Sequence, residues 1–562
     1  MVANALLTAD SLGWFGLAAA KIYLEQHPHE NILVLESSGS SGGTWAEHRI
    51  YPALKSNNLH GTYEYPDFPM HPEVYGVTKG EHIPGNVLHR YLTDFAKKFG
   101  VFGRTRFHTK VDSIEQLVDD KGWKLRVSSA DTNEPITTTK LILATGLTST
   151  PNFPQYPGCE TFKGQYFHAK DFAPNGHTVK TAQNAVVIGG AKSAYDVAYA
   201  YADSGVQVDL VIRPDGQGPV WISHPYVDFG LQLEKLLHVR FLTCFSPCPW
   251  GGEAGYGGFR NWLHGTKIGR WLVDKFWATL AGGVIAANGY ASHAETAKLT
   301  PWNSAFWIGS GLSIHNYPKN FFDMIKQGKI RVHIANVDHL TEHEVHLSTG
   351  DILKADVVVC ATGWKKDSPL QYINFPESKL GLPQTPAEQQ RLVQQADEEI
   401  LTRFPRLKDQ PELRSAVVKP GSDPYRLYRF IVPPTMLKSR NIAFAGMVST
   451  VSTAICATAQ ALWISTFFDG QLDRLAQTTD EVTREVMLHT QWGKWRYPSG
   501  YGANFPDFVF DALPYADLLL NDLGLNVNRK GNGFMELFAP YGPGDFVGLV
   551  DEWREKHGVR AD

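Results

Sequence analysis

The chain has 562 residues, of which 43% are hydrophobic and 20% are charged, with 53 Lys and Arg against 57 Asp and Glu. This composition is that of a globular protein with several domain-sized units, and it excludes a disordered or low-complexity chain. With a net charge of −4, the chain does not have the excess of basic residues that is typical of a nucleic-acid-binding protein.

The cysteines and the apolar segments indicate the cellular compartment in which the protein is expected. Five scattered cysteines form neither a disulfide framework nor a zinc-ligand pattern. The longest uncharged run, residues 442–468, is interrupted by Ser and Thr, which predicts a buried strand and helix rather than a membrane span. The N-terminus has no basic region of a signal peptide. We therefore expect a cytoplasmic protein with reduced thiols, no metal site and no transmembrane segment.

The first predicted nucleotide-binding unit begins at a turn containing Gly13 and Gly16. A helix over 17–26 and an apolar strand over 31–35 follow, and the strand ends at Glu36. Glycines let the backbone approach a pyrophosphate at a helix N-terminus. An acidic residue roughly 20 residues further on accepts hydrogen bonds from the ribose hydroxyls. This order predicts the later part of a βαβ dinucleotide unit.

The start of this unit is irregular. Ser11 stands where the first glycine is expected, and Asp10 would place a charge at the end of the preceding strand. A weakened nucleotide site and a chain whose first residues are not the native start would both produce this pattern.

The second unit is more regular. A strand over 185–188 leads into a G-x-G-x-x-A variant that contains Gly189, Ala191, Lys192 and Ser193; a helix and a strand over 206–212 follow. Arg213 comes 24 residues after Gly189, where an NAD site carries an acid. A cation there accommodates a 2′-phosphate and favours NADPH over NADH, the alternative being a solvated arginine at a strand end.

Between the two units, the segment 162–172 matches the pattern F-x-G-x-x-x-H-x-x-x-F through Phe162, Gly164, His168 and Phe172. It resembles the fingerprint of flavin-containing monooxygenases. The resemblance implies that His168 organises the junction of two nucleotide domains rather than carrying protons. Phe172 resembles the flavin-containing branch, because Baeyer–Villiger enzymes usually carry Trp at that position.

Shorter segments in the same order extend the resemblance over about residues 13–470. They imply cofactor contacts at Gly43, Thr44, Trp45, Ser56, Asn57, Val111, Thr145, Gly146, Thr362, Gly363 and Gly446. The helix after Gly446 is expected to begin near Val451 or Ser452 and to aim its N-terminus at the flavin, where the helix dipole stabilises an anionic ring.

The implied architecture is an α/β protein with two Rossmann-like domains. An FAD-binding domain (1–150 and 365–470) is interrupted by an NADPH-binding domain (155–362), which carries a Trp-rich, mainly helical insertion over about 221–307. Residues 471–562 are expected to be a C-terminal extension packed on the body, which is loop-rich over 501–558 except for a helical turn over 515–520.

The implied activity is that of an FAD- and NADPH-dependent monooxygenase. A flavin C4a-(hydro)peroxide would transfer one oxygen atom from O2 to a hydrophobic small molecule, and the amide of Asn57 would be the catalytic group. No cysteine pair follows the first glycine turn, which argues against a disulfide reductase. Two alternatives stay open: a Baeyer–Villiger monooxygenase acting on a ketone, and a flavin-deficient binding protein that retains the fold.

Overall fold

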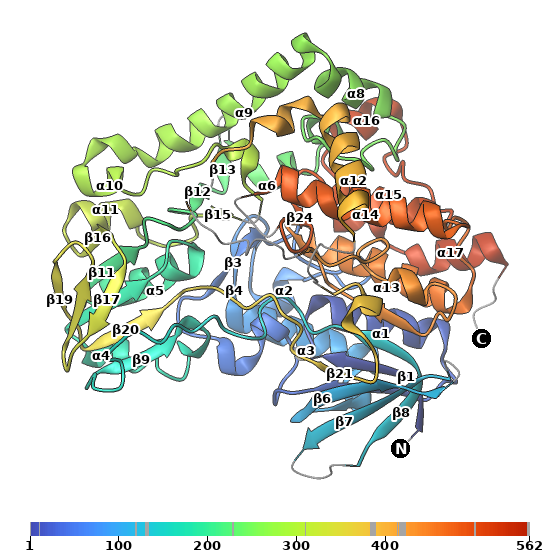
Figure 1. The fold of residues 1–562 in the computed structure, drawn as a ribbon, viewed down its shortest axis with the longest axis horizontal. Helices are drawn as coiled ribbons and strands as arrows, with labels where there is room; N and C mark the ends of the chain where they lie inside the picture. The colour runs from blue at the N-terminus through green and yellow to red at the C-terminus, as the bar shows by residue number, and fades with distance from the viewer. Residues whose placement is uncertain are drawn as a thin grey trace.

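The computed structural model describes residues 2–9, 12–118, 121–129, 134–227, 230–309, 311–382, 389–412, 414, 423–498 and 502–558. Two sheets stand at opposite ends of the molecule, and a layer of helices runs across one side of both (Figure 1). A short hairpin, β3 (Lys55–Leu59) with β4 (His82–Pro84), lies between the sheets.

The larger sheet has the strand order β21-β6-β7-β8-β1-β2-β5. Within it, β1 (Val2–Ala9) pairs in parallel with β2 (Ile32–Glu36) on one side and with β8 (Ile136–Leu143) on the other. The first strand of the unit is therefore formed, whereas Asp10 and Ser11 lie outside the described residues. The other strands are β5 (Thr105–Arg106), β6 (Thr109–Gln116), β7 (Trp123–Ser129) and β21 (Gln371–Ile373).

A strand from late in the chain completes this sheet. β22 (Ile442–Phe444) pairs in parallel with residues 141–143 of β8. It is followed by α13 (Thr453–Asp469), a helix buried on nearly all sides. The uncharged run is thus confirmed as a buried strand and helix. α13 packs along α1 (Trp14–Gln26), which begins three residues earlier than predicted.

The smaller sheet is parallel throughout, with the order β16-β11-β10-β20-β9. The predicted strand–turn–helix–strand unit is confirmed as β10 (Asn184–Ile188), α5 (Lys192–Asp203) and β11 (Gln207–Ile212). The remaining elements are β9 (Gln165–His168), β16 (Ile330–Ile334), β20 (Val357–Cys360), α4 (Thr178–Thr181), α11 (Phe321–Lys326) and the antiparallel strands β17 (Val337–Leu340), β18 (Glu344–Leu347) and β19 (Ile352–Lys354).

The insertion is mainly helical, as predicted. Its longest helix, α9, runs across the side of the molecule and ends at Gly289, whose φ of 58° is a left-handed conformation suited to glycine (Figure 1). The helices are α6 (Leu233–Leu236), α7 (Arg240–Thr243), α8 (Gly257–Gly265), α9 (Lys267–Asn288) and α10 (Ala294–Ala297). Short strand pairs flank them: β12 (Trp221–Ser223) with β15 (Leu312–Ile314), and β13 (Tyr226–Val227) with β14 (Leu231–Gln232).

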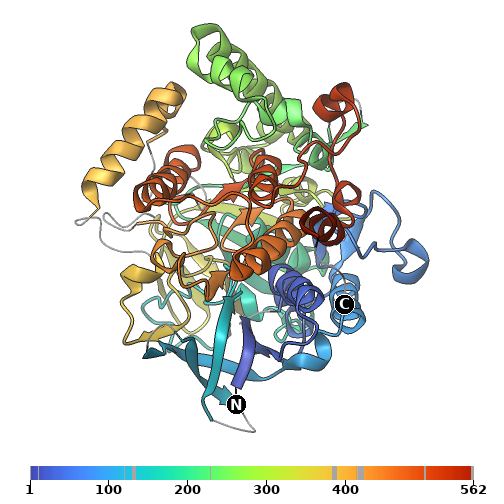
Figure 2. The ribbon, with the colours of Figure 1, turned by 90° about the vertical axis from the view of Figure 1, so that its right-hand side faces the viewer.

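The C-terminal extension differs from its prediction over 502–558, because that part is mainly helical rather than loop-rich. The helical turn expected over 515–520 is confirmed as part of a longer helix. The extension contains α14 (Thr479–Arg496), α15 (Ala512–Asp522), α16 (Gly533–Phe538) and α17 (Leu549–His557). Buried contacts provide the reason: Asp522, fully buried at the end of α15, accepts hydrogen bonds from Arg429 and from Trp463 of α13. Figure 2 shows α17 beside α1. Arg554 of α17 donates a hydrogen bond to the Glu25 carbonyl oxygen of α1.

The rest of the chain connects these layers. α2 (Pro72–Tyr75) lies in the connection between β3 and β4, and α3 (Gly85–Lys98) follows β4. β23 (Ser449–Thr450) pairs with β24 (Asp507–Phe508). Within the described ranges, no helix combines the length and apolar character needed to cross a bilayer.

Candidate functional site

The first glycine turn lies at the carboxyl end of the larger sheet, beside Glu36. Gly13 is the N-cap of α1, and no side chain caps that helix. Glu36 ends β2 with its side chain fully buried, and it accepts hydrogen bonds from the Leu12 N–H and from Ser38. An uncapped helix start next to a buried carboxylate has the donors for a pyrophosphate and the acceptor for a ribose, so the residues fit an adenine dinucleotide.

Two other predicted segments meet this turn. The Gly42 N–H donates to the Leu12 carbonyl at 2.8 Å, which holds the short 3₁₀ helix of Gly43, Thr44 and Trp45 (Gly43–Trp45) against it. Gly446 has a φ of 81°, and a Cβ there would lie 2.8 Å from the ring of Phe15, in the first turn of α1. Gly446 must therefore be small for the late turn and the first turn to pack together.

The second glycine turn has the same construction. Gly189 has a φ of 146°, its N–H donates to the Val211 carbonyl, and a Cβ would lie 2.4 Å from the Ala361 carbonyl oxygen. Ala191 is the N-cap of α5, which no side chain caps, and Ser193 is exposed in its first turn. Arg213 is exposed directly after β11. This arrangement fits a second dinucleotide, with a cation at the strand end that follows the turn.

Lys192 makes a connection that the sequence did not predict. Its Nζ is paired with Asp196 and donates to Oδ1 of Asn316 at 2.8 Å. The Asn316 Nδ2 in turn donates to the carbonyls of Lys55 and Ser56, both at 3.2 Å. The start of α5 is thereby linked to β3. Lys192 contacts the protein here, and its predicted cofactor contact stays a prediction.

Asn57 lies on β3, between the two sheets. Its side chain is exposed and its Nδ2 donates to Ser313 Oγ of β15 at 3.3 Å. Ser56 is buried and its Oγ accepts from the Ile83 N–H, which fixes the hairpin. Burial lowers the pKa of the nearby imidazole of His82 to about 4, so the histidine of β4 is neutral at physiological pH.

The fingerprint segment lies where the chain crosses between the sheets. His168 is buried, its Nε2 is hydrogen-bonded to the Gly363 carbonyl at 3.0 Å, and its Nδ1 accepts from the Lys170 N–H. Burial lowers the pKa of His168, and both ring nitrogens are engaged. Phe172 is buried against Tyr51 and Tyr201. These contacts are those of an organising group rather than of a proton carrier.

The two crossing segments are bonded to each other. Thr362 Oγ1 donates to the Asn152 carbonyl at 2.6 Å, and the Asn152 N–H donates to the Gly363 carbonyl at 2.9 Å. A cleft beside them is lined by Thr145 and Gly146, among others, and reaches Lys366, whose pKa burial lowers to about 7. Thr362 and Gly363 thus hold the crossing.

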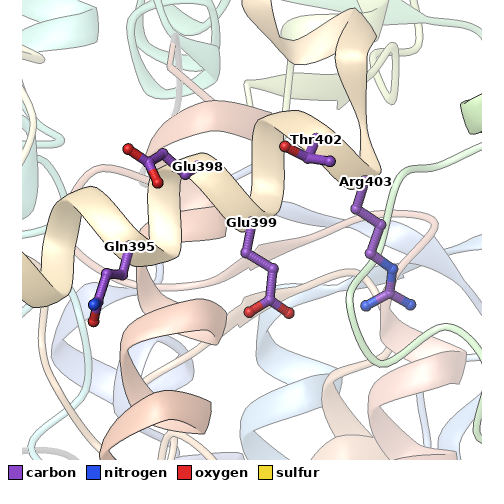
Figure 3. Close-up of a pocket in the computed structure, with 5 residues that line it drawn as sticks. All are labelled: Gln395, Glu398, Glu399, Thr402 and Arg403. Carbon is purple, nitrogen blue, oxygen red and sulfur yellow. The ribbon is translucent and has the colours of Figure 1, made fainter.

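The remaining predicted residues are distributed as follows. Val111 is buried on β6, where its backbone pairs with Val127. Phe162 is half-buried, and a Cβ at Gly164 would lie 2.3 Å from the Asp356 carbonyl oxygen. A separate hollow on α12 (Gln390–Arg403) is lined by charged and polar side chains of that helix alone, including Glu398 and Arg403, and no predicted site residue contributes to it (Figure 3).

The sequence missed the residues that join the insertion to the site. Glu234 and His238 lie in or just after α6, and neither belongs to a motif. Asn58 is bonded to Glu234 and directly follows Asn57. That place beside a predicted catalytic residue is the one sequence signal that could have pointed to Asn58 as part of the site.

Two uncapped glycine turns, each following a parallel strand, define a flavoprotein oxidoreductase with two dinucleotide folds. A family model described as pyridine nucleotide-disulphide oxidoreductase matches residues 13–225. Only Cys159 falls in that range, and it is a free thiol. The match therefore concerns the dinucleotide folds and brings no disulfide chemistry.

Whole-chain relatives identify the family. An FAD-dependent monooxygenase of Aspergillus nomiae is 33% identical over 98% of this chain and 98% of its own length. An FAD-dependent monooxygenase of Pyrenophora dematioidea is 35% identical over 93% of this chain and 98% of its own. The open crystal structure of cyclohexanone monooxygenase has the same fold, with a TM-score of 0.59 and 15% identity, covering 92% of this chain and 97% of that one.

The chain belongs to the FAD-dependent monooxygenase family, and it is a flavoprotein oxidoreductase. The family resemblance that the fingerprint and the glycine turns predicted is thereby confirmed.

Proposed function

We propose that this protein binds FAD along the first glycine turn and NADPH along the second, and inserts one oxygen atom of O2 into a hydrophobic small molecule. When bound, FAD would accept a hydride from NADPH and activate O2, with the second oxygen atom leaving as water. The observation that carries the proposal is the link from the second turn to β3, through which Lys192 and Asn316 hold the strand that carries Asn57.

The chain's own residues supply binding and orientation. Glu36 would hold the flavin adenosine ribose, Arg213 the 2′-phosphate of NADPH, and the uncapped starts of α1 and α5 the two pyrophosphates. The amide of Asn57 has a donor and an acceptor, which suits an oxygen intermediate and a retained nicotinamide at one place. The start of α13 would place its positive dipole end near the flavin.

An enclosed apolar cavity supports the substrate class. It lies under α9, and its lining includes Trp221, Leu237, Trp277, Leu280, Val284 and Phe510. Leu312 also lines it and directly precedes Ser313, which contacts Asn57. Leu233 lines it too and directly precedes Glu234. Its free volume is about 30 Å³, so a substrate requires the lining to open, and an outward movement of α9 would open it as a lid does.

The proposal is tested with the purified full-length chain. We expect a yellow protein with a flavin absorption spectrum, which oxidises NADPH faster than NADH and converts an apolar amine or thioether to its oxide. Ester or lactone formation from a simple ketone, without amine or thioether oxidation, would assign Baeyer–Villiger chemistry instead. A colourless protein that takes up no added FAD would favour the flavin-deficient binding protein.

A further inference from the structure

The insertion contacts the flavin-side elements through two polar residues of one helical turn. Glu234 is half-buried, and its carboxylate accepts a hydrogen bond from Asn58 Nδ2 and one from the Leu59 N–H at 3.1 Å. Both donors belong to β3. A carboxylate buried among donors is held strongly, because a charged acceptor strengthens each hydrogen bond.

The same turn reaches the start of α13. The His238 Nδ1 is bonded to the Glu234 carbonyl oxygen at 2.7 Å, so this nitrogen carries the proton. Burial lowers the pKa of His238, and its Nε2 therefore accepts from the hydroxyl of Ser452. Asn58 Nδ2 completes the connection by donating to the Val451 carbonyl at 3.1 Å.

Ser452 occupies the N-cap of α13, yet its side chain accepts no hydrogen bond from that helix. A serine at this position ordinarily caps the first free N–H groups. Because its hydroxyl is directed to His238, the first turn of α13 keeps its N–H groups uncapped by a side chain. A helix start in this state is suited to a negatively charged ring.

We infer that Glu234 is a positioning residue that joins the insertion to both β3 and the α13 start, and that it holds Asn57 in place for oxygen transfer. This inference rests on the proposed function, because it assigns Glu234 the task of orienting Asn57. Glu234 acts through Asn58 and Leu59 and contacts no cofactor site itself. When α9 and the insertion move outward, these bonds are the ones between α6 and β3 that must break.

The test compares Glu234→Gln with the wild-type holoenzyme. A glutamine amide has a single acceptor oxygen, so it can keep the bond from Asn58 Nδ2 or the bond from the Leu59 N–H but must set its own donor against the other. We expect FAD content and the rate of flavin reduction by NADPH to stay within about twofold, whereas product formed per NADPH falls at least fivefold and hydrogen peroxide rises. Glu398→Gln, on the exposed face of α12 (Figure 3), is the matched control and should match wild type.

A double substitution tests the route. In an Asn58→Ala background, Glu234→Ala removes only the bond from the Leu59 N–H, so the double substitution should lower coupling by less than the sum of the two single losses. Unchanged coupling in Glu234→Gln, or additive losses in the double variant, would overturn the inference. A parallel loss of FAD content and thermal stability would assign Glu234 to folding alone and would overturn it too.

A readout independent of turnover separates this inference from the proposed function. In Glu234→Gln, amide hydrogen exchange should quicken in residues 55–59 and 450–456 and stay unchanged in the larger sheet. Faster exchange in a protein that forms no oxygenated product would keep the structural link and refute the monooxygenase proposal. Unchanged exchange would refute the link even if the wild-type enzyme were fully active.

Discussion

At the residue scale, the central feature is an exposed asparagine on a rigid hairpin. The neighbours of Asn57 are fixed: Ser56 by the Ile83 N–H and Asn58 by Glu234. Asn57 itself has one long hydrogen bond, to Ser313 at 3.3 Å. A side chain with a spare acceptor on a fixed backbone is preorganised for a ligand.

For Asn57→Ala we expect flavin reduction by NADPH within about twofold of wild type, because the substitution removes neither dinucleotide site. Product per NADPH should fall about tenfold, with hydrogen peroxide released instead. Peroxide and product are quantified against NADPH consumed. Asn528→Ala, at an exposed position between α15 and α16, serves as control, and wild-type coupling in Asn57→Ala would remove Asn57 from the site.

Arg213 decides between the two nicotinamide cofactors. It is exposed directly after β11, whose Val211 carbonyl accepts from the Gly189 turn. For Arg213→Asp we expect KM for NADPH to rise at least tenfold and KM for NADH to change less than about twofold, because only NADPH carries the 2′-phosphate. Steady-state kinetics with both cofactors give the ratio. Equal losses would show that Arg213 does not meet the phosphate; Lys180→Asp, exposed on α4, is the control.

At the element scale, α9 is a cover with two faces. One face closes the apolar cavity, and the other exposes residues such as Ala278 to solvent. Its end at Gly289 and its contacts with β12 and the segment 305–307 hold it over the site. Substrate size should therefore depend on side chains of the inner face alone.

Ala281→Phe tests this. Ala281 lines the cavity, so a phenyl ring there should lower kcat/KM for bulky apolar substrates about tenfold while NADPH oxidation without substrate stays unchanged. Ala278→Phe places the same ring on the outer face of the same helix and should have no effect. Equal effects of the two substitutions would show that the cavity is not the substrate path.

At the scale of the whole molecule, buried neutral histidines make stability depend on pH. His264 is buried in α8 of the insertion, and burial together with the charge of Arg260 lowers its pKa to about 3. The unfolded chain has the ordinary histidine pKa of about 6.5, so it takes up the proton first as the pH falls. The contribution of neutral His264 is fully present above about pH 6.5 and is lost progressively as the pH falls toward 3.

We therefore expect the difference in apparent Tm between wild type and His264→Gln to shrink between pH 7 and pH 4.5. The variant lacks the titrating group, whereas every other titrating group is common to both proteins, including acids such as Asp511 whose pKa burial raises. Thermal unfolding at one scan rate measures the difference. His71→Gln, at an exposed histidine, should show a constant difference, and a constant gap for His264→Gln would contradict the assignment.

The sequence by itself determined the two dinucleotide units and the residues at their turns, because glycine spacing and strand–helix order are local properties. It also determined the buried character of α13 and the helical insertion. The helical character of residues 502–558 was beyond it, because Asp522 and its cationic partners are far apart in sequence.

Only the tertiary structure decided how the insertion meets the site. Glu234 lies 176 residues from Asn58, and His238 lies 214 residues from Ser452, so no local pattern connects them. Burial then set their protonation and hydrogen-bonding roles, because charge and tautomer follow from the surrounding dielectric and partners. Spacing along the chain specifies the cofactor folds, whereas burial between distant segments specifies how the catalytic hairpin is held.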